Sequence, residues 1–159
     1  MTTRKLRARI CDRTPLHDPQ RDEVVLVNEF RPGVLACGEY PYTDNLVAGA
    51  IEPGESPIEA GVREMQEEAG LALLDPVLIR QGAYVSSGGT SEKISLVYGR
   101  VDTAAAGGIH GAPTQREQTL AVVLPAQVFI ERVRSGAIND FKTLVAGYWF
   151  AERRTTAVK

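Results

Sequence analysis

Apolar and polar residues follow two periods along the chain, one typical of strands and the other of helices. The run EVVLVNEF (23–30) is rich in β-branched residues and predicts a buried strand. Charged and apolar residues alternate over 5–11, which predicts a half-exposed strand before it. The stretch GVLACGEY (33–40) follows Arg31-Pro32, and we expect it to form another strand. Three later runs also predict strands: 76–85, 92–101 and 119–124.

The clearest helix begins at Ser56 and ends at Gly70, a typical C-terminal stop. Ser56 supplies an N-cap hydroxyl, Pro57 occupies the first helical position and Glu59 provides a carboxylate at the third, which together predict a capping box. With about 100° per residue, four apolar side chains share one stripe that we expect to face the core: Ile58, Val62, Met65 and Ala69. Three glutamates then project together on roughly the opposite side: Glu64, Glu67 and Glu68.

Two more helices are predicted in the last third of the chain. The first follows Pro125 and ends near Gly136. The second carries apolar residues at helical spacing, which predicts a helix docked on the sheet: Phe141, Leu144, Val145, Tyr148 and Trp149. Strands with interspersed helices predict a layered α/β or α+β domain.

Composition limits the class of protein. The 159 residues suffice for one domain over 1–159, with a short strand segment at 1–22. Hydrophobic residues make up 43% and charged residues 24%, as in an ordinary globular protein rather than a disordered or coiled one. The formal net charge of -2 gives no electrostatic reason to expect nucleic acid or an anionic membrane as a partner.

The cysteines and the N-terminal stretch lead us to expect a cytoplasmic protein. Cys11 and Cys37 form neither a disulfide framework nor a CxxC metal motif, and we expect two small buried residues in a reducing compartment. The N-terminal stretch lacks the apolar core of a signal peptide, and no run of about 18 apolar residues could span a bilayer.

The acidic helix face is the strongest candidate for chemistry. Like charges one turn apart destabilise a helix, so something should offset them. Oxygen ligands from Glu64 and Glu68 can hold Mg²⁺, which takes its other ligands from water and phosphates. Arg63 beside them can orient a carboxylate through a two-pronged salt bridge. The alternative is a solvated acidic face without a ligand.

A longer pattern around these residues favours a metal site. Residues 49–71 (GAIEPGESPIEAGVREMQEEAGL) match a glycine, five residues, a glutamate, seven residues and then R-E-U-x-E-E-x-G-U, where U is bulky and aliphatic. A chance match at one starting point is on the order of 10⁻⁸ at ordinary residue frequencies.

This string resembles the Nudix box, the signature of hydrolases that act on a nucleoside diphosphate linked to another group. The resemblance implies a Nudix-type α/β/α sandwich with a mixed central sheet, and a loop–helix–loop that binds catalytic Mg²⁺, with Mn²⁺ as a substitute. By position in the box, Glu64 and Glu68 would be metal ligands together with the backbone carbonyl of Ala48.

The other charged residues of the box would support those ligands. By the same resemblance, Glu67 would assist them, and Glu55 and Arg63 would brace the loop against the helix. These three residues complete the catalytic set implied by the box itself.

Beyond the box, the chain is similar to ADP-ribose pyrophosphatases. VVLVNEFRPG, LVAGAIEPGES, SSGGTSEK and VDTAAAGGIHG resemble segments of those enzymes in the same order. By position, the residues that contact the substrate would be Phe30, Arg31, Gly88, Gly89 and Glu92. Glu117, after GIHG, would be the general base that deprotonates the attacking water, and its alternative is a solvated loop glutamate. The resemblance implies a homodimer whose substrate is a small molecule, a nucleoside diphosphate sugar. With ADP-ribose as that substrate, hydrolysis gives AMP and ribose 5-phosphate.

Two departures from that branch leave the substrate open. Ser87 stands where those enzymes commonly have a proline, and only 22 residues precede Glu23, where they carry a longer segment that helps to clamp the purine. GDP-mannose is the alternative substrate, because its hydrolases share the GG turn and a pattern like SGAINDFKT (135–143). Two further hypotheses are a catalytically silent sensor of nucleotide sugars and a structural domain with an acidic surface.

Overall fold

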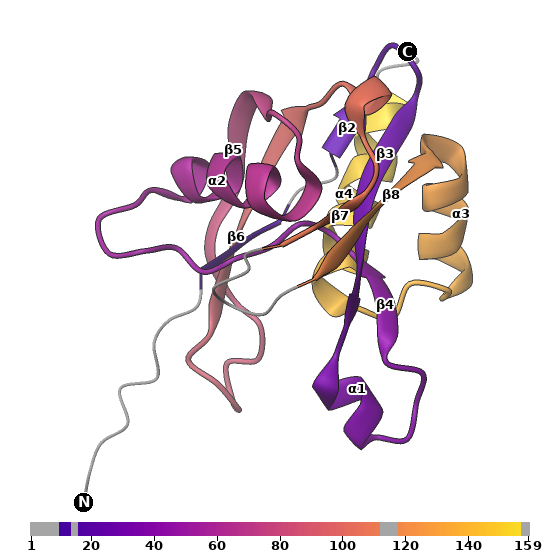
Figure 1. Ribbon diagram of the computed structural model, residues 1–159. Coiled ribbons are helices and arrows are strands. Elements are labelled where there is room, and N and C mark those ends of the chain that lie inside the picture. The colour runs from indigo at the N-terminus through magenta and orange to yellow at the C-terminus, as the bar shows by residue number, and fades with distance from the viewer. Residues whose placement is uncertain (1–9, 14–15, 112–117, 157–159) are drawn as a thin grey trace, which may run out of the picture.

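A mixed sheet forms the centre of the molecule (Figure 1). The computed structural model describes residues 10–13, 16–111 and 118–156. The strands are β1 (Ile10–Arg13), β2 (Leu16–Asp18), β3 (Glu23–Phe30), β4 (Tyr42–Asn45), β5 (Leu74–Tyr84), β6 (Lys93–Arg100), β7 (Ile109–His110) and β8 (Thr119–Pro125). Their order is β1-β6-β2-β3-β8-β7, with β4 paired to β3 and β5 to β6. β1 and β2 run parallel to β6, and the other pairs are antiparallel.

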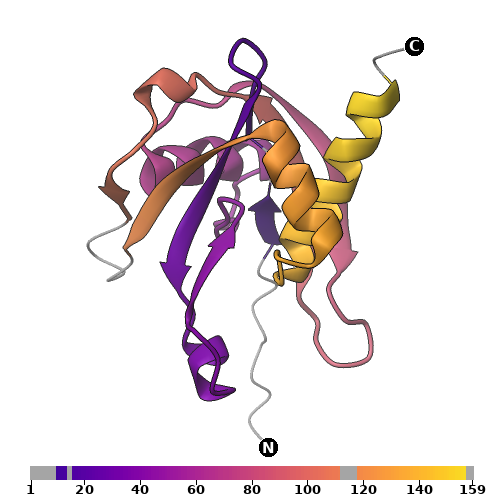
Figure 2. The ribbon, with the colours of Figure 1, turned by 90° about the vertical axis from the view of Figure 1, so that its right-hand side faces the viewer.

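Helices cover both faces of this sheet. They are α1 (Pro32–Ala36), α2 (Pro57–Ala69), α3 (Ala126–Ser135) and α4 (Phe141–Thr156), with a 3₁₀ turn η1 (Thr103–Ala105). Figures 1 and 2 show α2 on one face and α3 and α4 on the other. The expected α/β/α sandwich with a mixed central sheet is therefore confirmed.

Strand β3 shows why the sequence folds into these layers. Side chains alternate between the two faces of a strand. Val24 and Leu26 pack into the core beneath α3 and α4, whereas Val25 and Val27 pack beneath α2. All four are fully buried, and each stabilises the fold by about 1.5–3 kcal/mol through leaving water. The strand predicted over 23–30 is confirmed.

Most other predicted elements are also present. β5, β6 and β8 correspond to the later three predicted strands, and α3 ends at the residue before Gly136. The alternating segment over 5–11 lies mostly outside the described residues, and β1 begins at its end.

Residues 33–40 do not form the expected strand. Pro32 begins the five-residue helix α1 instead, because its ring fixes φ in the helical range and it has no N–H for a strand ladder. The chain then turns back so that β4 pairs with β3. The Arg31 N–H donates to the Pro41 carbonyl at 2.7 Å, which joins the two ends of the segment between β3 and β4.

The surface around α1 corrects a second expectation. Cys37 at its C-terminal end is exposed rather than buried, and α1 has no buried residue. Among the helices described here, none is both long and apolar enough to cross a membrane.

The buried face of α4 differs from the predicted one. Phe141, Val145 and Tyr148 are exposed. The buried positions are Thr143, Ala146, Gly147, Phe150 and Ala151. A Cβ on Gly147 would lie 2.5 Å from Cγ2 of Val133, so the small residues of α4 form the side that approaches α3. Two of the residues predicted to face the core are partly buried and pack against it: Leu144 and Trp149.

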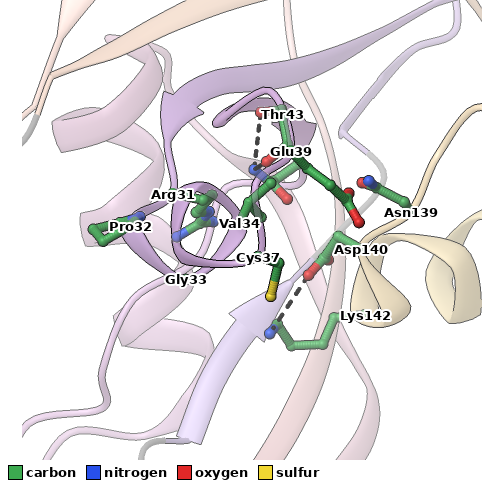
Figure 3. Close-up of a pocket in the computed structure, with 11 residues that line it drawn as sticks. Arg31, Pro32, Gly33, Val34, Cys37, Glu39, Thr43, Asn139, Asp140 and Lys142 are labelled. Carbon is green, nitrogen blue, oxygen red and sulfur yellow. Dashed lines mark hydrogen bonds and ion pairs between the residues drawn. The ribbon is translucent and has the colours of Figure 1, made fainter.

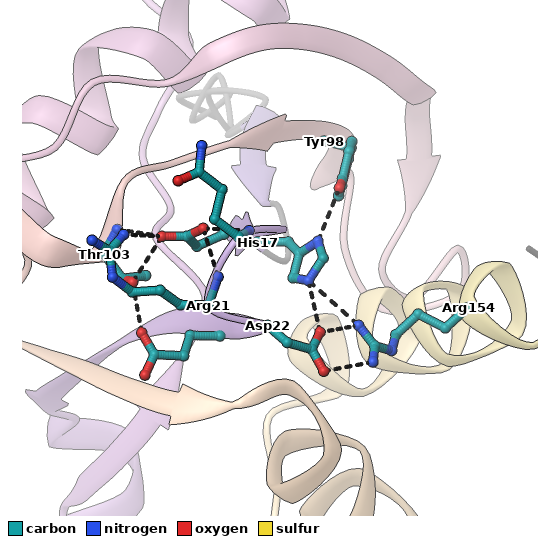
Figure 4. A network of polar contacts seen from close by, with 9 residues as sticks. His17, Arg21, Asp22, Tyr98, Thr103 and Arg154 are labelled. Atoms are coloured by element: carbon teal, nitrogen blue, oxygen red, sulfur yellow. Dashed lines mark hydrogen bonds and ion pairs between the residues drawn. The ribbon is translucent and has the colours of Figure 1, made fainter.

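A polar network fastens the turn between β2 and β3 (Figure 4). The buried Asp18 carboxylate accepts hydrogen bonds from the Thr103 N–H at 3.0 Å and from its hydroxyl at 2.9 Å. Arg21 Nη1 also donates to it at 2.9 Å. These bonds, led by the Thr103 N–H, hold the pKa of Asp18 well below its usual range despite burial. Asp22 in the same turn accepts from Arg154 Nη2 of α4 at 2.8 Å, so the network joins three separate segments.

Candidate functional site

The capping box fixes where the acidic helix α2 begins. Ser56 Oγ accepts from the Glu59 N–H at 3.3 Å, and Glu59 Oε2 accepts from the Ser56 N–H at 2.8 Å. The latter bond is the main reason that the pKa of Glu59 lies below its usual value. Gly70 ends the helix with a φ of 67°, in the left-handed region that favours glycine. Both predicted ends are confirmed.

The side of α2 that carries the acids is not a solvated face. Glu64 and Glu68 are only 7% and 5% exposed. In the predicted apolar stripe, Met65 and Ala69 are fully buried, but Val62 is 41% exposed. The expectation that Val62 shares the buried stripe is therefore wrong, and the acids are buried because the backbone at Ala48 and Gly49 also packs on this helix.

The backbone at Ala48 and Gly49 receives both buried carboxylates. The Ala48 N–H donates to Glu68 Oε2 at 3.0 Å. A Cβ on Gly49 would lie 1.6 Å from Glu64 Oε1, so only glycine leaves room for that carboxylate. Two side chains from successive turns of α2 thus meet two consecutive backbone residues.

Arg63 connects the box loop to the acidic helix. Its Nε donates to Glu55 Oε1 at 2.9 Å and its Nη2 to Glu55 Oε2 at 3.1 Å, which is a two-pronged contact. Its Nη1 donates to Glu64 Oε1 at 2.6 Å and lies 3.4 Å from Glu67 Oε2. Nη2 also donates to the Ala50 carbonyl at 2.9 Å. The Glu55 contact is the largest reason that the pKa of Glu55 is lowered and that the pKa of Arg63 is raised.

The donor set suits a hard divalent cation. Mg²⁺ binds one or two carboxylates, with water and phosphate oxygens as its other ligands. Glu64 and Glu68 supply the carboxylates beside the backbone of Ala48. In the described part of the chain, no three Asp, Glu, His or Cys side chains are gathered as a complete metal site.

The C-terminal turn of α2 is hydrogen-bonded to the residue that follows β7 and to the first residue of β8. The Gly111 N–H donates to the Glu67 carbonyl at 2.9 Å, and the buried Thr119 hydroxyl donates to the Glu68 carbonyl at 2.7 Å. Helix ends leave such carbonyls without intrahelical partners. In the sequence, Gly111 and Thr119 lie on either side of residues 112–117. Glu117, the expected general base, is one of these residues and lies outside the described part of the chain.

Phe30 and Arg31 lie at the junction between β3 and α1. The Phe30 side chain is 44% exposed, and its ring lies edge-on to that of Tyr42 with centroids 5.7 Å apart. Arg31 forms an ion pair with Glu29 and lines a pocket beside α1.

The other three expected substrate residues are not beside α2. The Gly88-Gly89 turn and Glu92 lie at the end of the β5–β6 hairpin, and Figures 1 and 2 show that end away from α2. The Gly89 N–H donates to the Ser86 carbonyl at 3.1 Å, and the Glu92 N–H donates to Thr90 Oγ1 at 3.1 Å.

The sequence interpretation missed the pocket that Arg31 lines (Figure 3). This pocket of about 550 Å³ lies between α1 and the start of α4, and Asn45, Asn139, Asp140 and Lys142 contribute to its lining. The pattern SGAINDFKT contains the last three, but nothing local indicates that they approach α1.

This chain is similar in sequence to two proteins named ADP-ribose pyrophosphatase. ADP-ribose pyrophosphatase of Escherichia coli is 38% identical over 134 residues, which cover 83% of this chain and 63% of that protein. ADP-ribose pyrophosphatase of Haemophilus influenzae is 32% identical over 136 residues, which cover 84% of this chain and 62% of that protein. The chain thus spans less than two thirds of the length of these relatives.

A solved structure and a family model extend this result. A crystal structure of an ADP compounds hydrolase has the same fold, with a TM-score of 0.73, 20% identity, and coverage of 94% of this chain and 74% of that one. The model of the NUDIX domain matches residues 14–139, which is most of the chain. The box at 49–71 and the sandwich around it are therefore those of a Nudix domain, and this chain belongs to the Nudix family.

Proposed function

We propose that this chain hydrolyses the diphosphate linkage of a nucleoside diphosphate sugar, with ADP-ribose as the substrate and AMP and ribose 5-phosphate as the products. The observation that carries the proposal is the pair of buried carboxylates, Glu64 and Glu68, held against Ala48 and Gly49. The relatives named ADP-ribose pyrophosphatase favour ADP-ribose over GDP-mannose.

In this proposal, Glu64, Glu68 and the Ala48 carbonyl hold Mg²⁺ or Mn²⁺, and Glu67 assists them. A divalent cation supplies positive charge to the diphosphate oxygens and makes a bound water more acidic. Arg63 keeps the carboxylates oriented through its contacts with Glu55 and Glu64.

Glu117 is the proposed general base. Its carboxylate takes a proton from the water that attacks one phosphorus of the diphosphate. As the new bond from the water oxygen to phosphorus forms, the bond from that phosphorus to the bridging oxygen breaks, and the bridging oxygen leaves with the electron pair on the other phosphate. The contacts of Gly111 and Thr119 with α2 support this role, because they fasten both sides of the segment that contains Glu117 to the acidic helix.

Phe30 and Arg31 are proposed to contact the nucleotide, the Gly88-Gly89 turn to approach the diphosphate, and Glu92 to contact the substrate. A homodimer is part of the proposal, because the hairpin turn lies away from α2 within one chain, and a second copy can bring its own turn to the site. An exposed thiol at Cys37 favours a reducing compartment, which agrees with a cytoplasmic location.

A substrate panel tests the proposed activity. The chain is incubated with ADP-ribose, GDP-mannose and NADH in Mg²⁺, and phosphate is measured after phosphatase treatment. We expect metal-dependent release from ADP-ribose, its loss in Glu68→Gln, and no change in Glu131→Gln, a matched substitution on α3. No metal-dependent release from any compound would sink the proposal, and binding without turnover that Glu68→Gln leaves unchanged would favour a sensor.

Glu117→Gln tests the general base separately. We expect turnover to fall by roughly 10²–10⁴-fold while Mg²⁺ binding, measured by calorimetry, is retained. Unaltered turnover would remove the proposed role of Glu117 without affecting that of the α2 acids.

A further inference from the structure

The pocket between α1 and the start of α4 has a buried polar floor. We call it the α1–α4 pocket, lined among others by Arg31, Val34, Asn45, Asp140 and Lys142. Figure 3 shows that its labelled residues come from two segments far apart in sequence, 31–43, which includes α1 and part of β4, and 139–142 at the start of α4. Asn45 is the most deeply buried of these five, at 1% exposure.

The amide of Asn45 is satisfied on one side only. Its Nδ2 donates to the carbonyl and to Oγ1 of Thr43, both at 3.0 Å. A main-chain carbonyl can only accept, so this contact fixes which atom is nitrogen and leaves Oδ1 on the other side. Within the described residues, no hydrogen bond to Oδ1 is present. A buried acceptor without a partner costs free energy, and native proteins seldom keep one without a reason.

The charges around the pocket suit hydroxyl groups beside a phosphate. Arg31 and Lys142 are cations, each paired with a carboxylate, Glu29 and Asp140 respectively. The carboxylates and the side-chain Oδ1 of Asn45 are hydrogen-bond acceptors, and the hydroxyls of a sugar can donate to such groups. The 11 lining residues include no aromatic ring on which a base could stack.

The pocket is also within reach of the acidic helix. Asn45 ends β4, and Ala48, which holds Glu68, follows three residues later. Three residues of extended chain span at most about 10 Å. One nucleoside diphosphate sugar can therefore place its diphosphate near α2 and its sugar in the pocket.

We propose that the α1–α4 pocket binds the sugar of the substrate, next to the nucleotide that Arg31 contacts at the edge of the pocket, and that Asn45 Oδ1 accepts a hydrogen bond from one of the hydroxyls of this sugar. Asn45 is then a specificity-determining residue. This inference rests on the proposed function, since it assigns one part of that substrate to one part of the site.

Product binding tests the inference without turnover. The affinities for ribose 5-phosphate and for AMP are measured by calorimetry in Mg²⁺ for the wild type, Asn45→Leu and Asn45→Asp. In Asn45→Leu we expect ribose 5-phosphate to bind roughly 5- to 10-fold more weakly, the effect of one lost hydrogen bond, with AMP unchanged. Asn45→Asp keeps an acceptor at the Oδ1 position but, like Asn45→Leu, loses the Nδ2 donor to the Thr43 carbonyl, so it should bind ribose 5-phosphate more tightly than Asn45→Leu does.

Stability and a matched control separate recognition from folding. Asn45→Leu removes the two hydrogen bonds from Nδ2 to Thr43 together with the acceptor without a partner, so its midpoint of urea unfolding should fall, and an AMP affinity at the wild-type level shows that the fold is kept. Asn28→Leu is the control, because Asn28 lies on the neighbouring strand, where its side chain donates to Asp44. It should leave the affinity for ribose 5-phosphate unchanged.

Three results would overturn the assignment. They are loss of AMP rather than ribose 5-phosphate affinity in Asn45→Leu, unchanged affinity for both, and no measurable binding of ribose 5-phosphate to the wild type. A failure of the proposed function would instead appear in the substrate panel, where the wild type would hydrolyse none of the compounds. The binding measurements do not depend on hydrolysis, so the two failures can be told apart.

Discussion

The carboxylate of Glu64 occupies the space that a side chain on residue 49 would need. A Cβ on Gly49 would lie 1.6 Å from Glu64 Oε1, which is far inside van der Waals contact. The next residue towards the N-terminus, Ala48, is hydrogen-bonded to Glu68, so the backbone is held on the same helix face. The first glycine of the box is therefore required by the placement of an acid 15 positions later in the sequence.

Gly49→Ala should displace Glu64. We expect Mg²⁺-dependent turnover to fall at least roughly 10²-fold, because a misplacement of about 1 Å has that effect, and the free energy of unfolding to fall by about 1–3 kcal/mol. Mg²⁺ titration of ADP-ribose hydrolysis and urea unfolding measure the two effects. Gly33→Ala is the control for stability, because a Cβ there meets no atom within 4 Å. Wild-type Mg²⁺ dependence in Gly49→Ala would contradict the proposed placement.

Arg63→Lys should separate charge from geometry. Lysine keeps the positive charge but cannot reproduce the two-pronged contact with Glu55. Because this contact lowers the pKa of Glu55, its stabilisation is present above the ordinary glutamate pKa of about 4.3 and is lost as pH falls through the folded-state value. The difference in free energy of unfolding between wild type and variant should therefore be larger at pH 7 than at pH 3. An equal difference at both pH values would refute this account.

Asp18→Asn should weaken the contact between β2 and η1. The Asp18 carboxylate accepts several hydrogen bonds while almost fully buried, and we expect a loss of about 2–4 kcal/mol at pH 7. Its lowered pKa means that this stabilisation is present above about pH 4 and is lost progressively at lower pH. Urea unfolding between pH 3 and pH 7 measures the effect. Asp75→Asn, at an exposed ion pair with Arg100, is the control and should change stability by less than about 1 kcal/mol.

Thr119→Val should uncouple β8 from the end of α2. The buried hydroxyl donates to the Glu68 carbonyl, so its removal leaves that acceptor unsatisfied at a cost of about 1–3 kcal/mol. We expect kcat to fall more than KM changes, because Glu117 lies two residues before Thr119. Thr119→Ser should restore both stability and kcat, and a kcat that stays at the wild-type value in Thr119→Val would argue against coupling.

Local chemistry made much of this fold predictable. The Ser56 capping box and the Gly70 stop define α2 because both act within one helical turn. The apolar run of β3 predicts a buried strand because every side chain, whichever face it takes, has to leave water.

Contacts between distant segments were not predictable in the same way. The periodicity of α4 suggested that Phe141 and Tyr148 face the core, yet both are exposed because Gly147 offers the closer approach to α3. The segment after Arg31 has apolar residues like those of a strand, but Pro32 begins a short helix and β4 takes the place beside β3.

The sequence by itself determined which groups are available, namely the acids of α2, the arginine among them, and the helix that spaces them. The tertiary structure alone decided that Glu64 and Glu68 are buried against Ala48 and Gly49, and that Asn45 lies in one pocket with Asp140. The physical reason is range. Capping and periodicity act over a few residues, whereas the place of the segment between β4 and α2 depends on strand pairing and on packing between both layers of the sandwich.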